Sequence, residues 1–236
     1  MVKREIELHH KLVHPNIVQL YGAFLDGDRI VLVQEYAARG DLFHLLRQLG
    51  GRMTEPQVSE LVMRPFLEAM AYLHSQGICH RDIKPENILY TDKADFGVSI
   101  DLNQERAVTR AGTVDYMAPE VTRCPLKALP TDNKDDESLA YTSAVDVWAA
   151  GVLAYELLLG FTPAVAPQQA AMGMAPPLLP ASASGGPPFP TSMSGGARRF
   201  ILAALSPDPG DRPTAMELLR HGWIAGPSLS RTSASQ

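Results

Sequence analysis

Four residues able to do chemistry together lie within one short segment, residues 82–95. Asp82 and Asp95 carry carboxylates, Lys84 carries a cation two residues after Asp82, and Asn87 carries an amide oxygen. Such hard oxygen atoms are the ligands that Mg²⁺ prefers, and a positioned carboxylate can accept or orient the proton of a hydroxyl. An isolated aspartate is most often a solvated loop residue, so a catalytic interpretation depends on these four residues occurring together and in this order.

The motifs around these residues follow one another in a fixed order. His80–Asn87 reads His-Arg-Asp-Ile-Lys-Pro-Glu-Asn, and Asp95-Phe96-Gly97 begins eight residues after its end. Gly112-Thr113 and Ala118-Pro119-Glu120 come next. This order resembles the catalytic loop, metal-binding turn and activation segment of the eukaryotic protein kinases. Lys84, and Gly112-Thr113 ahead of Tyr116, resemble the serine/threonine type, nearest to Aurora-like and calcium/calmodulin-dependent-like kinases.

The resemblance implies a role for each of the chemically active residues. Asp82 would act on the attacking hydroxyl, and Lys84 would neutralise charge that develops on the γ-phosphate of ATP. Asn87 and Asp95 would hold Mg²⁺. The other nucleotide-binding residues that the resemblance implies are Glu35, Ala37, Asp41, Glu86 and Leu89. Two of these have a plain structural alternative, because Asp41 could cap the helix that follows it and Leu89 could be an ordinary core leucine.

The same resemblance assigns regulatory residues. Thr109 occupies the position of an activating phosphate, and Arg81 would bind that phosphate. Thr113 would contact Asp82. Glu5 matches the glutamate that pairs with the ATP-binding lysine, although it could equally be one of several solvated charges on a helix. Three structural residues complete the set: an ion pair between Glu120 and Arg212, and Asp146, which would accept backbone amides of the catalytic loop.

Hydrophobic periodicity and capping signals predict the elements that position these residues. A helix is expected over residues 2–13, ended by His14-Pro15, and a hairpin around Asp26-Gly27-Asp28. Its strands are expected at 17–24 and 29–34. Thr54 and Pro56 signal the start of a helix that runs to about Ser75. Further helices are expected over 42–49, 144–159, 197–205 and from Thr214 to about 223.

The resemblance predicts an α+β, two-lobed fold with a complete, mostly helical large lobe and a partial small lobe. Residues 1–35 would form the partial small lobe and residues 36–225 the hinge and large lobe. A low-complexity insertion covers 164–196, where the composition predicts mobile or irregular chain, and residues 226–236 would be a disordered tail.

Two departures from the family pattern stand out. The sequence has no glycine-rich phosphate loop and no lysine strand ahead of the first helix, so we expect a truncated chain or an incomplete gene model. Only residues 88–94 separate Asn87 from Asp95, and the β-hairpin that the family places there barely fits. We therefore expect the packing that holds Asp95 in place to be weakened.

Composition limits the environment and the partners. The 236 residues carry a net charge of −5, which gives no reason to expect nucleic acid or a membrane as a partner. Cys79 and Cys124 are too few for a disulfide framework, so a reducing compartment, cytoplasmic or nuclear, is expected. The apolar run 144–161 contains Asp146 and Glu156, which favours a buried helix over a membrane span.

The sequence therefore predicts an ATP- and Mg²⁺-dependent serine/threonine protein kinase. Its partners would be protein substrates and an upstream activating kinase. The alternative is a catalytically inactive, kinase-like scaffold or a truncated fragment. Asp82, Lys84, Asn87 and Asp95 favour the enzyme, because a scaffold has no physical need of all four. The absent phosphate loop and lysine favour the alternative.

Overall fold

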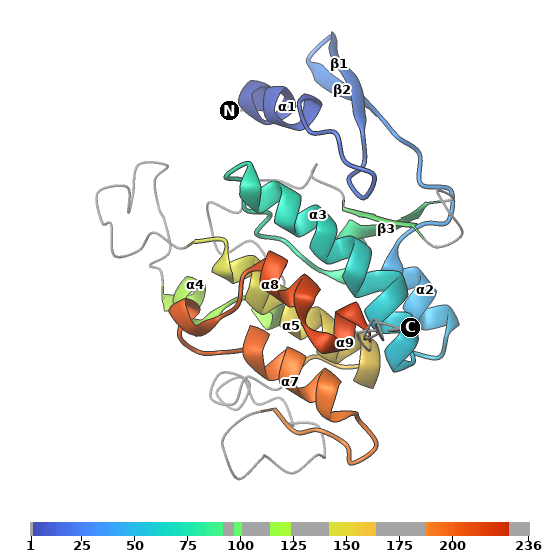
Figure 1. Cartoon of the computed structure of the whole chain (residues 1–236). Coiled ribbons are helices and arrows are strands. Elements are labelled where there is room, and N and C mark those ends of the chain that lie inside the picture. Colours follow the sequence, from blue (N-terminus) through green and yellow to red (C-terminus); the bar gives the residue numbers. More distant parts are fainter. Residues whose placement is uncertain (1, 92–96, 101–113, 124–141, 164–186, 227–236) are drawn as a thin grey trace, which may run out of the picture.

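The computed structural model describes residues 2–91, 97–100, 114–123, 142–163 and 187–226. Its N-terminal part consists of helix α1 (Val2–His10) beside an antiparallel ribbon of β1 (Leu20–Asp26) and β2 (Arg29–Gln34). Figure 1 shows this unit standing apart from a larger, mostly helical body, to which it is joined by the segment after β2. The molecule therefore consists of two lobes of unequal size.

Helix α1 ends three residues before the predicted end at residue 13. Lys11 and Leu12 donate backbone hydrogen bonds to Leu8 and His9, so the chain winds into a tight turn in place of another helical turn. His9, which is buried, bonds through Nε2 to the carbonyl of Val18 at 2.8 Å. That contact fixes the helix against the start of the ribbon.

The ribbon begins later than the sequence predicts, at residue 20 in place of residue 17. Asp26 pairs with Arg29 across a two-residue turn of Gly27 and Asp28. Gly27 has φ of +58°, a left-handed conformation that favours glycine and is suited to the tight turns of hairpins. The hydrogen bonds of this turn set the register along the ribbon as far as a bulge between Leu20 and Gly22.

One long helical segment in the larger lobe changes its winding part-way along. The predicted helix over 54–75 is a π-helix, η1 (Gln57–Met63), followed by α3 (Arg64–Ser75). Arg64 donates its backbone N–H to Ser59, five residues back. Pro65 has no N–H and its ring would clash with the carbonyl four residues earlier in an α-helix. The wider π winding just before Pro65 avoids that clash.

The second ribbon corrects the expected hairpin between Asn87 and Asp95. Strand β3 (Ile88–Thr91) pairs antiparallel with β4 (Gly97–Ile100), which follows Asp95 in the sequence. The seven residues 88–94 therefore need to supply only one strand. The partner strand comes from the chain beyond Asp95.

The remaining elements pack around helix α5 (Ala144–Leu159). Nearly all of its side chains are buried, as expected for a helix that is apolar all round. Helix α3 packs against α8, and α5 packs against α7. The other elements are α2 (Leu42–Gln48), η2 (Pro85–Asn87), η3 (Val114–Tyr116), α4 (Pro119–Arg123), α7 (Gly195–Ala204), η5 (Pro209–Asp211), α8 (Ala215–Arg220) and α9 (Gly222–Ala225).

The end of the predicted low-complexity insertion has regular structure. Residues 187–196 include the start of α7, where the side chain of Ser194 accepts the N–H of Ala197 as an N-cap. Tyr155 donates its hydroxyl to the carbonyl of Pro188 at 2.8 Å. Residues 164–186 and 227–236 lie outside the described residues. Within the described ranges, no helix has both the length and the apolar character needed to cross a bilayer.

Candidate active site

The loop before β3 is anchored by a buried carboxylate on α5. Asp146 accepts the backbone N–H of His80 and that of Arg81, each at 2.8 Å. His74, in the last turn of α3, contacts the same carboxylate through Nε2 at 2.9 Å. A buried carboxylate needs donors of this kind, so Asp146 ties the loop to two helices at once.

Electrostatics keep Asp146 ionised. Burial raises the pKa of its carboxyl, but the hydrogen bond from His74, electrostatic interactions with His80 and His74, and the hydrogen bond from the amide of Arg81 together outweigh burial. The pKa of Asp146 therefore lies below its usual value. The neighbouring Cys79 thiol has its pKa raised by burial and by Asp146, so this cysteine stays protonated.

Arg81 has an unusual backbone conformation. Its φ is +71°, and it is the one non-glycine residue with positive φ among the described residues. This left-handed conformation costs about 1–2 kcal/mol for a residue with a side chain. The hydrogen bond from Arg81 N–H to Asp146 helps to hold it, and the loop then turns Asp82 towards Lys84 and Asn87.

Asp82, Lys84 and Asn87 meet at one point. Lys84 Nζ lies 3.1 Å from Asp82 Oδ2. The amide of Asn87 donates from Nδ2 to the same Oδ2 at 2.9 Å and to the Asp82 carbonyl at 2.7 Å. Asp82 is half-buried. The carboxylate is therefore held in one orientation by a cation and an amide. Asn87 is the last residue of η2, and β3 follows it directly.

The other end of the Asn87 side chain fits a metal ligand. Asn87 is buried, and its Oδ1 has no hydrogen-bond partner within the described part of the chain. A buried acceptor without a partner is costly. An amide oxygen is also a ligand that Mg²⁺ accepts. Because Nδ2 is engaged by Asp82, the amide is fixed with Oδ1 pointing away from that carboxylate.

The segment that joins the lobes lies beside β3. Asp41 forms a β-bridge with Leu89, and the N–H of Tyr90 bonds to Gly40 at 2.8 Å. Asp41 caps α2 through Oδ1, which accepts the N–H of His44 at 2.7 Å. Asp41 and Leu89, two of the predicted nucleotide-binding residues, are therefore neighbours.

Glu35 and Ala37 begin the same segment. Glu35 donates its N–H to Gln19 and accepts the N–H of Gln19 through Oε2. Ala37 accepts a backbone bond from Gly40 at 3.4 Å. Both residues are half-buried, whereas Glu86, in η2, is exposed.

Glu120 and Arg212 form a two-pronged ion pair. The two guanidinium nitrogens lie 2.7 and 2.8 Å from the two carboxylate oxygens. Arg212 also donates to the carbonyls of Ser206 and Ala144 and lies over the ring of Trp148 at 5.0 Å. This buried arginine joins α4, the start of α5 and the turn at η5.

Sequence reasoning missed two partners near the site. His74 was assigned only to a helix, although its place one turn before the loop is the available signal. The second is Glu156, on α5, which accepts the hydroxyl of Tyr116. Burial raises the pKa of Glu156, the Tyr116 bond lowers it, and the carboxylates of Glu86 and Asp115 raise it further, for a net increase.

Several predicted site residues cannot be placed. Asp95, Thr109 and Thr113 lie outside the described residues. Glu5 lies on α1, and the structure describes the backbone there and not its side chain.

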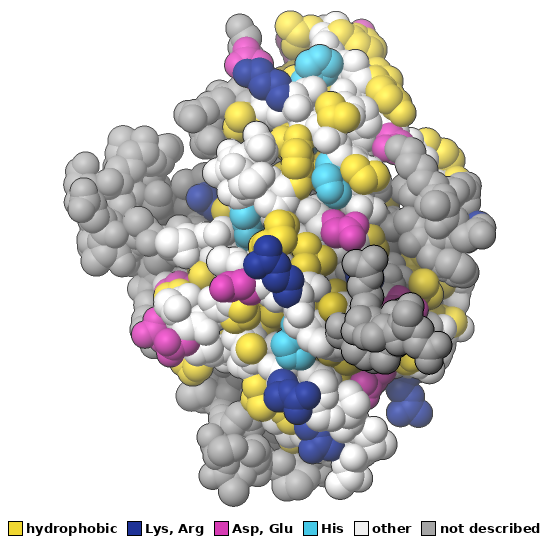
Figure 2. Space-filling view, viewed as in Figure 1, with side chains coloured by type: hydrophobic (Ala, Val, Ile, Leu, Met, Phe, Trp, Pro, Cys, Tyr) yellow, Lys and Arg dark blue, Asp and Glu magenta, His cyan; other side chains and the backbone are white. Residues whose placement is uncertain are grey.

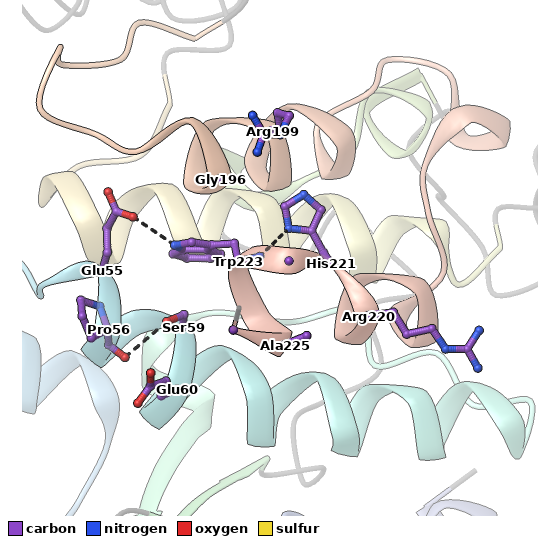
Figure 3. Close-up of a pocket in the computed structure, with 12 residues that line it drawn as sticks. Glu55, Pro56, Ser59, Glu60, Gly196, Arg199, Arg220, His221, Trp223 and Ala225 are labelled. Atoms are coloured by element: carbon purple, nitrogen blue, oxygen red, sulfur yellow. Dashed lines mark hydrogen bonds between the residues drawn. The ribbon is translucent and has the colours of Figure 1, made fainter. Parts of the chain in front are cut away.

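A separate pocket of about 740 Å³ lies in the larger lobe, between η1, α7 and the last two helices (Figure 3). Glu55 holds its wall together: its carboxylate accepts Trp223 Nε1 at 3.1 Å and both the N–H and the hydroxyl of Ser194. None of the candidate catalytic residues lines this pocket.

Comparison with known proteins decides the family. The model of the protein kinase domain matches residues 1–224. The chain belongs to the protein kinase family. It is 35% identical over 228 residues to an Aurora kinase of Encephalitozoon cuniculi, covering 94% of this chain and 77% of that protein. Aurora kinase B of Mus musculus is 34% identical over 228 residues, covering 94% and 60%.

A third relative comes from another branch of the family. A calcium/calmodulin-dependent protein kinase of Emericella nidulans is 35% identical over 244 residues, covering 98% of this chain and 54% of that protein. The chain thus spans between about half and three quarters of the length of these three relatives. The match confirms the kinase resemblance and the α+β kinase fold, and it supports a function of the serine/threonine type.

Proposed function

We propose that this kinase transfers the γ-phosphate of ATP to serine or threonine side chains of protein substrates. The observation that carries the proposal is the meeting of Asp82, Lys84 and Asn87 on a loop fixed by Asp146. Phosphoryl transfer asks a protein mainly for positioning and for neutralisation of charge. A carboxylate and a cation held 3.1 Å apart beside a buried amide oxygen can do both.

Each residue has a distinct task in this proposal. Asp82 orients the substrate hydroxyl and takes its proton as the oxygen attacks phosphorus. Lys84 neutralises negative charge on the transferred phosphoryl group. Asn87 holds Asp82 through Nδ2 and offers Oδ1, together with Asp95, to Mg²⁺. When bound, Mg²⁺ neutralises phosphate charge and orients the phosphates.

The linking segment supplies the remainder of the nucleotide site. Backbone groups of Glu35 and Ala37 would hold the adenine, Leu89 would form the floor beneath it, and Asp41 would meet the ribose while capping α2. The β-bridge between Asp41 and Leu89 supports this assignment, because it brings the segment next to β3. Glu86, beside Asn87, would face the phosphate end.

The role of Asp82 is tested by Asp82→Asn in the intact chain, with ATP affinity and phosphate transfer measured on the same preparation. Transfer should fall by about 10²–10⁴-fold, the usual contribution of a general base, while ATP affinity changes little. Asp28→Asn, in the exposed turn of the ribbon, is a matched control and should leave both unchanged. Near-normal transfer by Asp82→Asn would show that another residue acts on the hydroxyl.

We also propose that phosphorylation of Thr109 by an upstream kinase activates the enzyme. A phosphate brings nearly two negative charges and strong acceptor oxygens. Arg81, whose side chain is exposed on the catalytic loop, would be its partner, and Thr113 would contact Asp82. Glu5 would pair with an ATP-binding lysine. Equal activity of Thr109→Ala and phosphorylated wild type, or no phosphate on Thr109 after treatment with an activating kinase, would refute the switch.

The proposed setting is intracellular, in the cytoplasm or nucleus, where ATP and protein substrates occur. The net charge of −5 supports partners other than nucleic acid or a membrane.

A further inference from the structure

The pocket between η1, α7 and the last two helices has walls of opposite charge (Figure 3). Glu55 and Glu60 line it from the side of η1. Arg199 lines it from α7, and Arg220 and His221 line it from the end of α8. Its volume of about 740 Å³ lies in the range of ligand-binding sites. The pocket can therefore hold a charged ligand and orient it between the two walls.

The rings of His221 and Trp223 are held in place from several sides. Trp223 donates its backbone N–H to His221 Nδ1 at 3.2 Å and its indole N–H to Glu55 at 3.1 Å. Both rings pack against Phe200, which is fully buried, at centroid distances of 5.5 and 5.0 Å. Because binding costs less when the groups that meet the ligand are already ordered, this wall is preorganised.

The hydrogen bond from Trp223 leaves His221 with a donor for a ligand. A neutral imidazole has one nitrogen that accepts and one that donates. Since Nδ1 accepts the N–H of Trp223, the proton of the neutral ring is on Nε2. Burial and the positive charge of Arg199 lower the pKa of His221, so the ring is neutral at pH 7 and presents Nε2–H.

Arg199 brings an uncompensated positive charge to the same wall. It is exposed, and Figure 3 shows the side chain of His221 pointing toward it. Figure 2 shows Lys and Arg side chains beside a His side chain over α7 and α8. Among the residues that the structure describes, no carboxylate forms an ion pair with Arg199, whose charge instead opposes that of protonated His221. An anion would relieve this repulsion and accept hydrogen bonds from both side chains.

We propose that the pocket docks a segment of a partner protein that carries a phosphorylated serine or threonine. The phosphate accepts hydrogen bonds from Arg199 and from His221 Nε2–H, and Arg220 adds a positive charge at the outer edge. Arginine suits this role because its planar guanidinium can donate two parallel hydrogen bonds to phosphate. A phosphate carries nearly two negative charges and three acceptor oxygens, so it satisfies several donors of this wall at once.

The rest of the pocket favours a peptide over a small phosphorylated molecule. Pro56 and Ala225, which line it, are exposed, so the pocket is open at the surface and an extended chain can cross it. Pro56 and Trp223 offer apolar surface to the side chains on either side of the phosphorylated residue. Glu60, on the opposite wall, repels the phosphate and so directs it toward α7 and α8.

The test is calorimetric titration of the intact chain with three probes. They are the heptapeptide Ala-Ala-Leu-Ser-Leu-Ala-Ala with its serine phosphorylated, the same peptide without phosphate, and inorganic phosphate. Wild type should bind the phosphorylated peptide about tenfold or more tightly than either other probe. Equal affinity for the two peptides would overturn the phosphate assignment. Inorganic phosphate that binds as tightly as the phosphorylated peptide would overturn the docking of a peptide.

The variant Arg199→Gln locates the binding. Arg199 is exposed, so its replacement should leave the fold intact. Affinity for the phosphorylated peptide should fall about 10–100-fold, as expected when hydrogen bonds to a charged group are lost. The matched control is Arg29→Gln, which removes one exposed positive charge from the ribbon of the smaller lobe and should leave affinity unchanged. Equal losses in the two variants would indicate a non-specific effect of charge and overturn the site.

An NMR titration of His221 gives a readout specific to the pocket. A phosphate beside the ring favours its charged form, so the pKa of His221 should rise when the phosphorylated peptide is bound. An unchanged pKa in the bound state would place the peptide elsewhere on the molecule and overturn the proposal. Arg199→Gln should leave phosphate transfer to a short peptide unchanged, since Arg199 lies outside the candidate active site. Failure of the docking proposal and failure of the proposed function are therefore distinguishable.

Discussion

At the scale of single residues, Asp146 and its donors fix the position of the catalytic loop. Asp146→Asn keeps one acceptor oxygen but loses the charge, and an amide donor then faces N–H groups. Hydrogen bonds to a charged group contribute about 1.5–3 kcal/mol, so we expect unfolding free energy to fall by about 3 kcal/mol. For a chain of this size that lowers Tm by about 6–12 °C, which calorimetry can measure. An unchanged Tm would contradict the anchoring role.

The difference in stability between wild type and Asp146→Asn should also depend on pH, in a direction that the pKa of Asp146 determines. The pKa of Asp146 is lowered in the folded state, whereas an unfolded aspartate titrates near pH 3.9. The stabilisation is complete above the unfolded value and is lost as pH falls through the folded value. The stability gap between wild type and Asp146→Asn should therefore be full at pH 7 and shrink below about pH 4. A gap that widens on acidification would reverse this sign.

The residue types predicted much of the candidate site, whereas the residues that hold the site in place were harder to predict. Asp82, Lys84 and Asn87 lie close together because eight residues of one loop contain them, so sequence proximity alone brings them near. Asp146 and His74 are far apart in sequence, and only the folded chain brings the last turn of α3 next to the first turn of α5. The motif order indicated Asp146, whereas the only signal for His74 was its place one turn before the loop.

At the scale of elements, the close approach of α5 and α7 depends on Gly151. A Cβ there would lie 2.8 Å from Ala204 Cβ and 3.0 Å from the Leu205 side chain, so a helix would have to move. Overpacking costs about 1–3 kcal/mol, while alanine returns up to about 1 kcal/mol of helix propensity. We expect Gly151→Ala to be destabilising by about 1–2 kcal/mol in chemical denaturation.

The matched control is Gly196→Ala in α7. There the new Cβ meets Trp223 only at 3.5 Å, an ordinary contact. The variant should be as stable as wild type or slightly more stable. If both alanine variants behave alike, the helices are not packed as described.

Arg212 tests how the elements at the start of α5 are joined. Lysine keeps the charge but cannot reproduce the two-pronged bond to Glu120, the carbonyl contacts or the stacking over Trp148. We expect Arg212→Lys to lose about 2 kcal/mol or more and to lower Tm by about 4–8 °C. A Tm within 1 °C of wild type, which is about the change expected for an ordinary surface substitution, would argue against this arrangement.

Element types were easier to predict than their boundaries and winding. The helix over 144–159 is unmistakable because it is apolar all round. The π winding before Pro65 and the early end of α1 depend on local clashes and turns that periodicity does not show. The strand that pairs with β3 follows Asp95. The seven residues between Asn87 and Asp95 could not reveal this, because pairing between strands is set by tertiary contacts.

At the scale of the whole molecule, the segment that links the two unequal lobes lies beside β3, and the catalytic loop leads into that strand. The family resemblance predicted this plan. Composition alone could not, since the residues typical of a protein kinase occupy a few positions in an otherwise ordinary, mildly acidic chain.

The measurement that tests the central claim most directly is transfer of labelled γ-phosphate from ATP to serine- and threonine-containing peptides by the intact chain, with Mg²⁺ present. Wild type should label serine or threonine in a time-dependent manner, labelling should stop when Mg²⁺ is chelated, and Asp82→Asn should fall to background. Absence of labelling by a folded wild type, including protein treated with an activating kinase, would contradict the enzyme and favour the inactive scaffold.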